Sequence, residues 1–251
     1  MPKAVQDFSR SRLRMRILLT RPREDAARVA EKLKLQHHII DIEPLLTIHY
    51  LDTPPNLDHI QALLFTSANG VRAFARLEET RVWPVFAVGQ QTSQQAEDMG
   101  FRHISSANGD SRDLARLVRA QLKPEKGPLF HGTSKTSPGA LRKELEEHGF
   151  VVHREFLYEA IAAKEFSVAA SSALKKGLYD IVLFFSPRTA RIFKELCIKE
   201  SMPRFPSSTA LCLSKAIGVE LGELGFKSIE IAQNPDLPSL MGLMDSIIRK
   251  R

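Results

Sequence analysis

The chain has 251 residues, 43% of them hydrophobic, so it can form one large α/β domain or two domains of roughly 100–125 residues. Its 36 lysines and arginines against 29 acidic residues give a net charge of +7, which favours an acidic partner. No aromatic residues interleave with the basic ones and no zinc or helix-turn-helix pattern appears, so we exclude nucleic acid as the partner. No apolar run approaches the length of a membrane span, which predicts a soluble, cytoplasmic protein.

Strand and helix patterns alternate along the first half of the chain. Residues 1–15 are predicted to form a disordered lead-in, after which a strand at 16–20 enters a helix near Pro22. A second strand at 38–42 continues as an extended, proline-punctuated segment at 43–50. The elements that follow are strands at 61–66, 85–88, 102–105, 128–132 and 150–154 and helices at 68–78, 90–99, 112–122 and 138–148. This alternation predicts a parallel, doubly wound sheet.

The second half of the chain repeats the alternation after another extended segment at 155–162. Its predicted elements are helices at 167–176, 188–199, 215–224 and 237–249 and strands that begin at 181, 209 and 228. The two halves also resemble each other in sequence. The internal matches are 65–77 with 184–196, 87–104 with 212–229 and, more weakly, 17–41 with 129–153. Such ordered self-similarity predicts two equivalent α/β units.

The arrangement of the strands predicts where these units begin and end. Five strands are complete between residues 60 and 155, and the other five come from the two ends of the chain. The predicted boundaries are 16–44 and 164–251 for a discontinuous domain, 51–155 for an inserted domain, and 45–50 and 156–163 for two connecting strands. We expect a ligand to bind in a cleft between the two domains, at the carboxyl ends of their strands.

Two strand-to-helix corners share one pattern. In each of them a buried strand reaches a serine that is a predicted N-cap, Ser67 in one and Ser186 in the other, and Pro187 occupies the first helical position of the second. Such a corner directs unpaired backbone N–H groups and the positive end of a helix dipole beyond the strand, which suits an anion. The alternative for each hydroxyl residue is an ordinary helix cap that binds no ligand.

These corners resemble those of the uroporphyrinogen-III synthase family, together with the Ala87-Val88-Gly89-x-x-Thr92 element, the opening Leu19-Thr20-Arg21-Pro22 and the segment around Tyr158. The resemblance runs from residue 16 to about residue 248. It implies two flavodoxin-like parallel-sheet domains joined by a two-stranded β-ladder. It also implies a lyase that cyclises the linear tetrapyrrole hydroxymethylbilane to uroporphyrinogen III, with inversion of ring D and loss of water. A monomer without cofactor is expected, and a handover of substrate from hydroxymethylbilane synthase is a further expectation.

The implied substrate is a polycarboxylate, so its site needs N–H and hydroxyl donors more than a nucleophile. Tyr158 is the candidate catalytic residue, because its phenol stays protonated at neutral pH and can donate a proton to the departing hydroxyl. The alternative for Tyr158 is packing in the hinge. The candidate substrate-binding residues are Thr20, Arg21, Ser67, Ala68, Asn69, Gly70, Gly89, Gln90, Gln91, Thr92, His131, Gly132, Ser186, Pro187, Arg188, Thr189, Ser214 and Lys215. No metal cluster or nucleotide loop is evident in the sequence, so neither metal nor cofactor is expected.

Two segments depart from the pattern of the family. Residues 214–217 lack the glycine and the hydroxyl residue of a second Gly-x-x-Thr element, and residues 131–135 lack the usual arginine and acidic residue. These departures keep a second hypothesis open, a non-catalytic two-domain binder of an acidic small molecule on the same scaffold.

Overall fold

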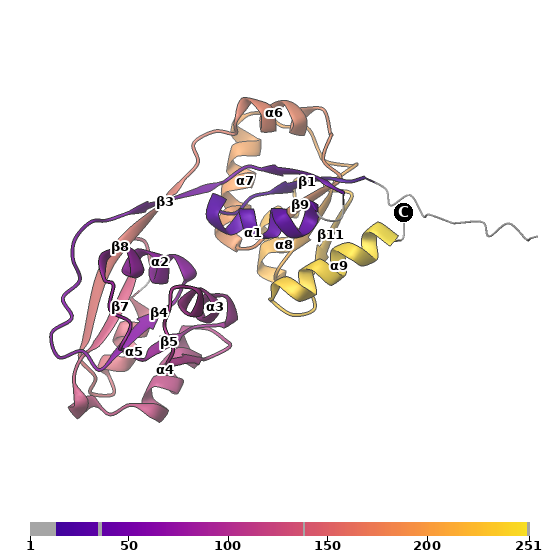
Figure 1. The fold of residues 1–251 in the computed structure, drawn as a ribbon. Helices are drawn as coiled ribbons and strands as arrows, with labels where there is room; N and C mark the ends of the chain where they lie inside the picture. Colours follow the sequence, from indigo (N-terminus) through magenta and orange to yellow (C-terminus); the bar gives the residue numbers. More distant parts are fainter. Residues whose placement is uncertain (1–13, 35–36, 138, 250–251) are drawn as a thin grey trace, which may run out of the picture. The chain divides into compact units, whose positions relative to one another are not determined.

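The computed structural model describes residues 14–34, 37–137 and 139–249 (Figure 1). Most of the predicted lead-in therefore lies outside the described residues. Met15 is described and is 2% exposed, and it packs in a hydrophobic core. Its backbone N–H donates to Nδ1 of His38, and its carbonyl accepts the N–H of Ile39. Met15 thus belongs to the folded part of the chain, because an apolar side chain here extends the buried face of the first strand.

The described chain forms two compact units. One combines the residues up to Thr47 with those from Ala162 onward, and the other consists of Ile48–Ile161. The chain therefore passes twice between the units, once within the strand Leu46–Tyr50 and once within the strand Val152–Ala162.

The first unit is built on a five-stranded parallel sheet. Its strands are β1 (Arg16–Leu19), β2 (Ile39–Ile42), β9 (Ile181–Phe184), β10 (Thr209–Cys212) and β11 (Ser228–Ile231). Its helices are α1 (Arg23–Lys34), α6 (Val168–Lys175), α7 (Pro187–Lys199), α8 (Lys215–Leu221) and α9 (Leu237–Arg249). The strand order is β11-β10-β9-β1-β2, and each recorded pair is parallel. In chain order this is the 2-1-3-4-5 arrangement of flavodoxin-like sheets.

The second unit contains a six-stranded sheet in the order β3-β8-β7-β4-β5-β6. Its strands are β3 (Leu46–Tyr50), β4 (Ala62–Phe65), β5 (Val85–Ala87), β6 (Ile104–Ser106), β7 (Leu129–Ser134) and β8 (Val152–Ala162). Its helices are α2 (Ala68–Leu77), α3 (Gln90–Asp98), α4 (Ser111–Gln121) and α5 (Ala140–Glu146), with a short 3-10 turn at Pro124–Lys126. The strands β4 to β8 pair in parallel. The predicted α/β class with parallel sheets is confirmed.

The two sheets have the same spatial order once strands that match in sequence are aligned. The internal matches equate β1 and β2 with β7 and β8, and β9 to β11 with β4 to β6. With the edge strand β3 left aside, the second sheet has the order β8-β7-β4-β5-β6, which matches β2-β1-β9-β10-β11 in the first sheet strand by strand. The two units are therefore circular permutations of one arrangement, since the matching strand pair opens one unit and closes the other.

Strands β3 and β8 carry the two chain crossings and pair with each other. The N–H of Leu51 donates to the carbonyl of Leu157 at 2.9 Å, and the N–H of Ala163 donates to that of Leu45 at 3.0 Å. Residue numbers rise along one strand as they fall along the other, so this pair is antiparallel. The strand predicted at 150–154 and its predicted extension form one continuous strand, β8.

Each sheet is covered on both faces, which explains the unbroken apolar runs of the central strands. Leu63 and Phe65 on β4 face the cluster with α2 and α3, whereas Ala62 and Leu64 face the cluster with α4 and α5. In the first unit, α1 and α9 pack on one face. On the helix α7, Phe193 contacts the rings of Phe184 on β9 and of Phe166, Phe205 and Phe226 in loops.

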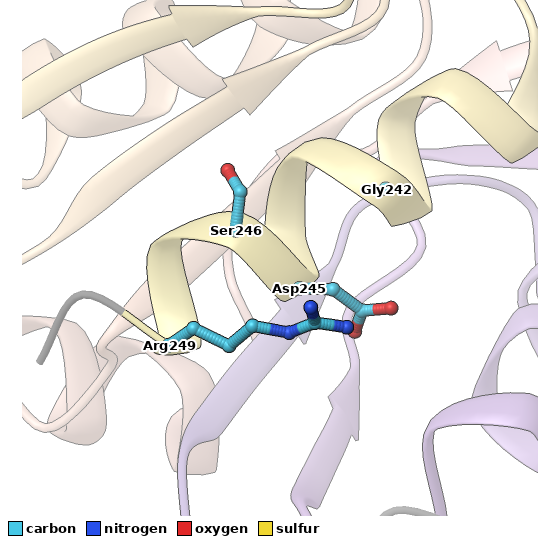
Figure 2. Close-up of a pocket in the computed structure, with 4 residues that line it drawn as sticks. All are labelled: Gly242, Asp245, Ser246 and Arg249. Carbon is cyan, nitrogen blue, oxygen red and sulfur yellow. The ribbon is translucent and has the colours of Figure 1, made fainter.

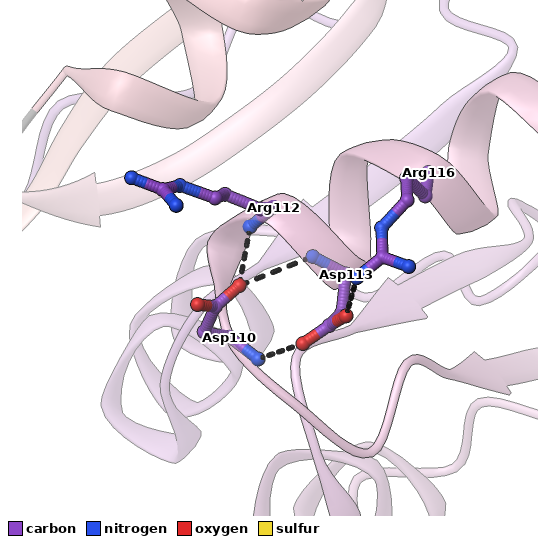
Figure 3. A network of polar contacts seen from close by, with 4 residues as sticks. All are labelled: Asp110, Arg112, Asp113 and Arg116. Carbon is purple, nitrogen blue, oxygen red and sulfur yellow. Dashed lines mark hydrogen bonds and ion pairs between the residues drawn. The ribbon is translucent and has the colours of Figure 1, made fainter.

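Local sequence also accounts for the ends of several helices, and α4 is an example (Figure 3). The side chain of Asp110 accepts the N–H groups of Arg112 and Asp113 at 2.7 and 3.1 Å. The carboxylate of Asp113 accepts the N–H of Asp110 at 2.8 Å and pairs with Arg116. The hydrogen bonds from the backbone of Asp113 and Arg112 hold the pKa of Asp110 below its usual value. This reciprocal capping box fixes the start of α4.

Candidate functional site

The corner between β4 and α2 is built by Ser67. Its backbone is extended, and its Oγ accepts the N–H of Gly70 at 3.1 Å, as expected of an N-cap. Among the described residues, the N–H groups of Ala68 and Asn69 have no recorded acceptor, as is usual in a first helical turn. The corner therefore presents two backbone donors beyond the carboxyl end of β4.

The phenol of Tyr158 reaches this corner from β8. Its oxygen lies 2.7 Å from Oγ of Ser67, and the tyrosine is 7% exposed. In the order of the sheet, β7 lies between the two strands that contribute these residues. Tyr158 pairs in register with Ser134 at the end of β7, after a register shift that follows Thr133. The sequence singled out both Ser67 and Tyr158 but did not predict their contact.

Two glycines allow close packing at this corner, Gly70 between α2 and β7 and Gly132 against the side chains of neighbouring strands. A Cβ atom on Gly70 would lie 2.7 Å from the carbonyl oxygen of Gly132, and one on Gly132 would lie 2.6 Å from a methyl carbon of Leu157. Real Cβ atoms do not come so close, so a side chain at position 70 would push α2 away from β7, and one at position 132 would displace the side chain of Leu157. Gly70 and Gly132 therefore have a packing role at the corner.

Arg72 connects this corner to the next helix, which the sequence reasoning missed. Its guanidinium donates to Oδ1 of Asn69 at 2.5 Å and to Oε1 of Gln95 on α3 at 2.7 Å. An arginine only donates hydrogen bonds, so it turns the amide oxygen of Asn69 toward itself and leaves the amide nitrogen as a further donor. The spacing of Asn69 and Arg72, three residues apart on a helix, is the signal that could have found this pair.

The start of α3, after β5, is a second source of backbone donors. Gly89 is its N-cap and has no side chain to occupy the first N–H groups. The N–H groups of Thr92 and Ser93 both donate to the carbonyl of Gly89. Gln90 and Gln91 are exposed, and among the described residues no acceptor is recorded for their N–H groups. Thr92 is 4% exposed and lies inside the turn.

The side chain of His131 does not lie at the edge of the sheet. It is 1% exposed on β7, and burial, aided by the charge of Arg154, lowers its pKa to about 4. Its imidazole is therefore neutral near pH 7.

In the first unit, Thr20 and Arg21 follow β1. Thr20 is fully buried, and its hydroxyl donates to the carbonyl of Leu183 at 2.7 Å. The side chain of Arg21 is 11% exposed, lies 3.2 Å from Asp25 and stacks 4.5 Å from the ring centre of Phe185. The hydroxyl of Thr20 thus holds β1 against β9, and Arg21 is held in place by an ion pair and a ring.

In the corner between β9 and α7, the serine hydroxyl contacts a residue of the same turn. Oγ of Ser186 accepts the N–H of Thr189 at 3.2 Å and lies 2.6 Å from the hydroxyl of Thr189, which is 2% exposed. Pro187 occupies the first helical position, as the sequence predicts, and contributes no N–H group. Arg188 is exposed at the second position.

At α8, Ser214 is the N-cap but its side chain makes no capping bond, and Lys215 is exposed.

Parallel pairing brings the predicted residues together within each unit. In the second unit, the corners after β4 and β5 lie at the carboxyl ends of neighbouring strands, and Tyr158 joins the first of them. In the first unit, Thr20, Ser186 and Ser214 follow the neighbouring strands β1, β9 and β10. The strand order reverses between β1 and β9 in the first sheet and between β7 and β4 in the second. Open α/β sheets bind ligands at the carboxyl ends of the strands at such a reversal. Each unit therefore has one donor-rich edge.

Other features lie apart from these edges. A pocket of about 350 Å³ is lined by Gly242, Asp245, Ser246 and Arg249 on one side of α9 (Figure 2), and no predicted site residue lines it. Within the described ranges, no group of three or more histidine, cysteine or acidic side chains could hold a metal ion. None of the helices described here has the length and apolar character needed to cross a bilayer.

The fold and these edges define a class of two-unit α/β proteins whose parallel sheets place helix starts and hydroxyl groups at the carboxyl ends of their strands, an arrangement that suits anions. A family model described as uroporphyrinogen-III synthase HemD matches residues 27–242, and the chain belongs to the uroporphyrinogen-III synthase family. Members catalyse a cyclising, lyase-type reaction on a tetrapyrrole substrate in haem biosynthesis. No curated protein matches the chain in sequence.

Solved structures agree with the family. The chain is similar to a uroporphyrinogen-III synthetase from Helicobacter pylori 26695, with a TM-score of 0.63 and 18% identity over 94% of this chain and 100% of that one. It is also similar to a mutant uroporphyrinogen III synthase from the extremely thermophilic bacterium Thermus thermophilus, with a TM-score of 0.55 and 16% identity over 94% and 100% of the two chains. At these identities the likeness shows the fold, and the function rests on the family match.

Proposed function

We propose that this chain is a uroporphyrinogen-III synthase that needs no cofactor. It cyclises hydroxymethylbilane to uroporphyrinogen III, with inversion of ring D and loss of water. The observation that carries the proposal, beside the family match, is the contact of Tyr158 with Ser67 at an edge rich in backbone N–H donors.

The carboxylates of the substrate bind the donor-rich edges. The exposed N–H groups at the starts of α2 and α3 and the amide of Asn69 receive some of them, and Arg72 adds positive charge nearby. Arg21 and the corner at Ser186 receive others in the first unit. The proposed binding residues are Thr20, Arg21, Ser67, Ala68, Asn69, Gly70, Gly89, Gln90, Gln91, Thr92, His131, Gly132, Ser186, Pro187, Arg188, Thr189, Ser214 and Lys215. Gly132 and Thr20 contribute through backbone groups, because Gly132 has no side chain and the hydroxyl of Thr20 already donates to the carbonyl of Leu183.

Tyr158 assists the loss of water. Oγ of Ser67 accepts an N–H group from Gly70, and its own hydrogen can point to the oxygen of Tyr158. The phenol then keeps its proton for the departing hydroxyl of the substrate. As the C–O bond breaks, the electron pair and this proton leave with the water, and the hydrogen bond from Ser67 stabilises the phenolate that forms. Ring closure later releases a proton from a ring carbon, which restores the phenol.

Much of the remaining acceleration comes from holding a flexible chain in its cyclising shape. Anchoring several carboxylates at fixed N–H groups removes rotational freedom before the reaction, an orientation effect that needs no further catalytic residue. The proposed boundaries of the two units are the connections at residues 45–50 and 156–163.

The proposal extends to the setting of the enzyme. The protein works as a monomer in the cytoplasm, and it receives its unstable substrate directly from hydroxymethylbilane synthase. Sedimentation of the purified protein tests the first point, and channelling in a mixture of the two enzymes tests the second.

A coupled assay tests the reaction itself. Porphobilinogen and hydroxymethylbilane synthase generate the substrate, which closes spontaneously to the type I isomer when no second enzyme is present. We expect added protein to produce an excess of the type III isomer at equal total porphyrin. If the isomer ratio stays that of the spontaneous reaction, the chain is a binder on the same scaffold, and direct binding of the linear tetrapyrrole then becomes the relevant measurement.

A further inference from the structure

Four buried polar atoms on β7 and β8 have no hydrogen-bond partner among the described residues. They are both ring nitrogens of His131, Oγ1 of Thr133 and Nε of Arg154. His131 is 1% exposed and Thr133 is 2% exposed, so bulk water does not reach these side chains. An unsatisfied buried polar group costs about 1–3 kcal/mol. Three such side chains in one place are typical of a site that a polar ligand completes.

The three side chains lie on one face of the sheet. His131 and Thr133 are two residues apart on β7, and such residues share a face of a strand. Arg154 pairs with His131 in the parallel register of β7 and β8, so it points the same way. Leu129 and Val152, earlier on this face, belong to the apolar cluster with α4 and α5. The three polar side chains therefore lie on the same face as the apolar cluster, nearer to the carboxyl ends of β7 and β8.

Arg154 gives this group a positive charge. Its guanidinium is half-buried, donates to the carbonyl of Ser137 at 2.5 Å and lies 5.0 Å from the ring centre of Phe156. No carboxylate among the described residues pairs with it. A guanidinium repels a metal cation, whereas an N–H group, a hydroxyl group and a guanidinium together are donors that an oxyanion accepts.

Gly139 lies near this guanidinium. A Cβ atom built on Gly139 would find only Nη1 of Arg154 within 4 Å, at 3.8 Å. The corner with Tyr158 lies on the other face of β7, since Gly132 faces Phe65 and Leu157.

We propose that His131, Thr133 and Arg154 form a binding site for a small oxyanion of the carboxylate or phosphate type. Arg154 supplies the charge, and the imidazole and the hydroxyl of Thr133 complete the oxygen contacts from the buried side. The site does not depend on the proposed reaction, because binding can be measured without turnover.

Titration of the full chain with inorganic phosphate at constant ionic strength tests the site. We expect a saturable shift of the ring signals of His131 in the NMR spectrum and a rise in Tm, as binding to the folded state requires. Chloride at the same ionic strength produces neither. If the ring signals of His131 do not respond to phosphate, the proposal is overturned without any variant.

Two substitutions make the test specific. Arg154→Gln removes the charge and is expected to weaken phosphate binding by about tenfold or more. Thr133→Val keeps the shape and removes only the hydroxyl, so it retains or raises Tm without phosphate and reduces the rise that phosphate causes. Arg142→Gln on α5 is the matched control, because Arg142 is exposed and pairs with Glu146. Equal phosphate affinity in all four proteins overturns the proposal.

Uroporphyrinogen III distinguishes the two sources of the oxyanion. If it displaces phosphate and shifts the same His131 signals, the site takes a carboxylate of the tetrapyrrole. If phosphate remains bound, the site serves a free ion. Both results support the site, and the isomer assay judges the proposed function separately.

Discussion

The corners after β4 and β9 begin from the same sequence pattern and end with different chemistry. In the second unit, Ser67 caps α2 and its hydroxyl contacts the phenol of Tyr158. In the first unit, Ser186 caps α7 and its hydroxyl contacts Thr189, within the same turn. The serine hydroxyl therefore contacts a side chain from a distant strand in one corner and a side chain of its own turn in the other.

The residues that the internal matches equate explain this difference. Gly70 and Gly132 in the second unit correspond to Thr189 and Thr20 in the first. The side chains of the two threonines are buried in their corner, and their hydroxyl groups donate hydrogen bonds to the carbonyls of Ser186 and Leu183. Gly70 instead lets α2 approach the backbone of β7, and Gly132 leaves space for the side chain of Leu157. We infer that the second unit carries the proton transfer and the first unit mainly binds.

The largest expected effect is on turnover. Tyr158→Phe removes the proposed proton donor and is expected to lower kcat by about 10²–10³-fold, with KM nearly unchanged. Tyr179→Phe is the control, because Tyr179 is 2% exposed in the first unit and burial raises the pKa of its phenol. The isomer assay measures both variants. Full turnover in Tyr158→Phe would remove the catalytic difference between the units.

The next effect concerns pH and stability. His131 corresponds to Leu19 in the first unit, and its folded pKa of about 4 lies below the unfolded value of 6.5. As the pH falls from 6.5 to 4, His131 binds a proton in the unfolded chain but stays neutral in the folded chain. The free energy of unfolding therefore falls, by up to about 3 kcal/mol. Above pH 6.5 both forms are neutral and this contribution vanishes.

His131→Leu copies the first unit and should remove this acid-side loss. Urea unfolding of both proteins in phosphate-free buffer between pH 7 and pH 4 measures it, and His148→Leu in the exposed turn after α5 is the control. Parallel stability curves for wild type and His131→Leu would contradict the expected burial of the imidazole.

A third prediction concerns the glycine pair. Gly70→Ala places a Cβ atom 2.7 Å from the carbonyl oxygen of Gly132, a backbone atom that cannot move without shifting β7. We expect a loss of about 1–3 kcal/mol in the free energy of unfolding. Gly242→Ala on α9 is the matched control, since no atom lies within 4 Å and the helix gains about 0.5–1 kcal/mol. Denaturant melts compare the two, and a Gly70→Ala protein as stable as wild type would mean that the close approach is not needed.

The smallest effects separate the two serines. Ser67→Ala and Ser186→Ala each remove an N-cap and should cost about 1 kcal/mol of stability. Only Ser67→Ala should also lower kcat, by about tenfold, because it removes the hydrogen bond to the phenolate. Ser186→Ala should raise KM instead. Equal kinetic effects of the two substitutions would show that the corners act alike.

Much of the fold could be predicted because its signals are local. The N-caps Ser67 and Ser186, the first-turn Pro187 and the capping residue Asp110 specify helix starts within a few residues of chain. The limits of strands and helices agree with the prediction to within a few residues, apart from the joining of two predicted segments into β8. Met15 was missed because a single apolar residue has no periodicity of its own.

Parts of the candidate site could not be predicted, because they join residues far apart in sequence. The contact of Tyr158 with Ser67 depends on strand order and on a register shift beside Thr133. The bridge from Arg72 to Gln95 depends on how α2 packs on α3. The burial of His131 depends on which face of β7 lies under α5.

The amino-acid order alone determined the alternation of strands and helices, the repeat and the helix starts, because each depends on short-range periodicity and capping. Tertiary structure decided which hydroxyl group would meet a phenol, which histidine would lose contact with water and which polar side chains of the described residues would be buried without a hydrogen-bond partner. These outcomes depend on side chains that only the pairing of distant strands brings close together.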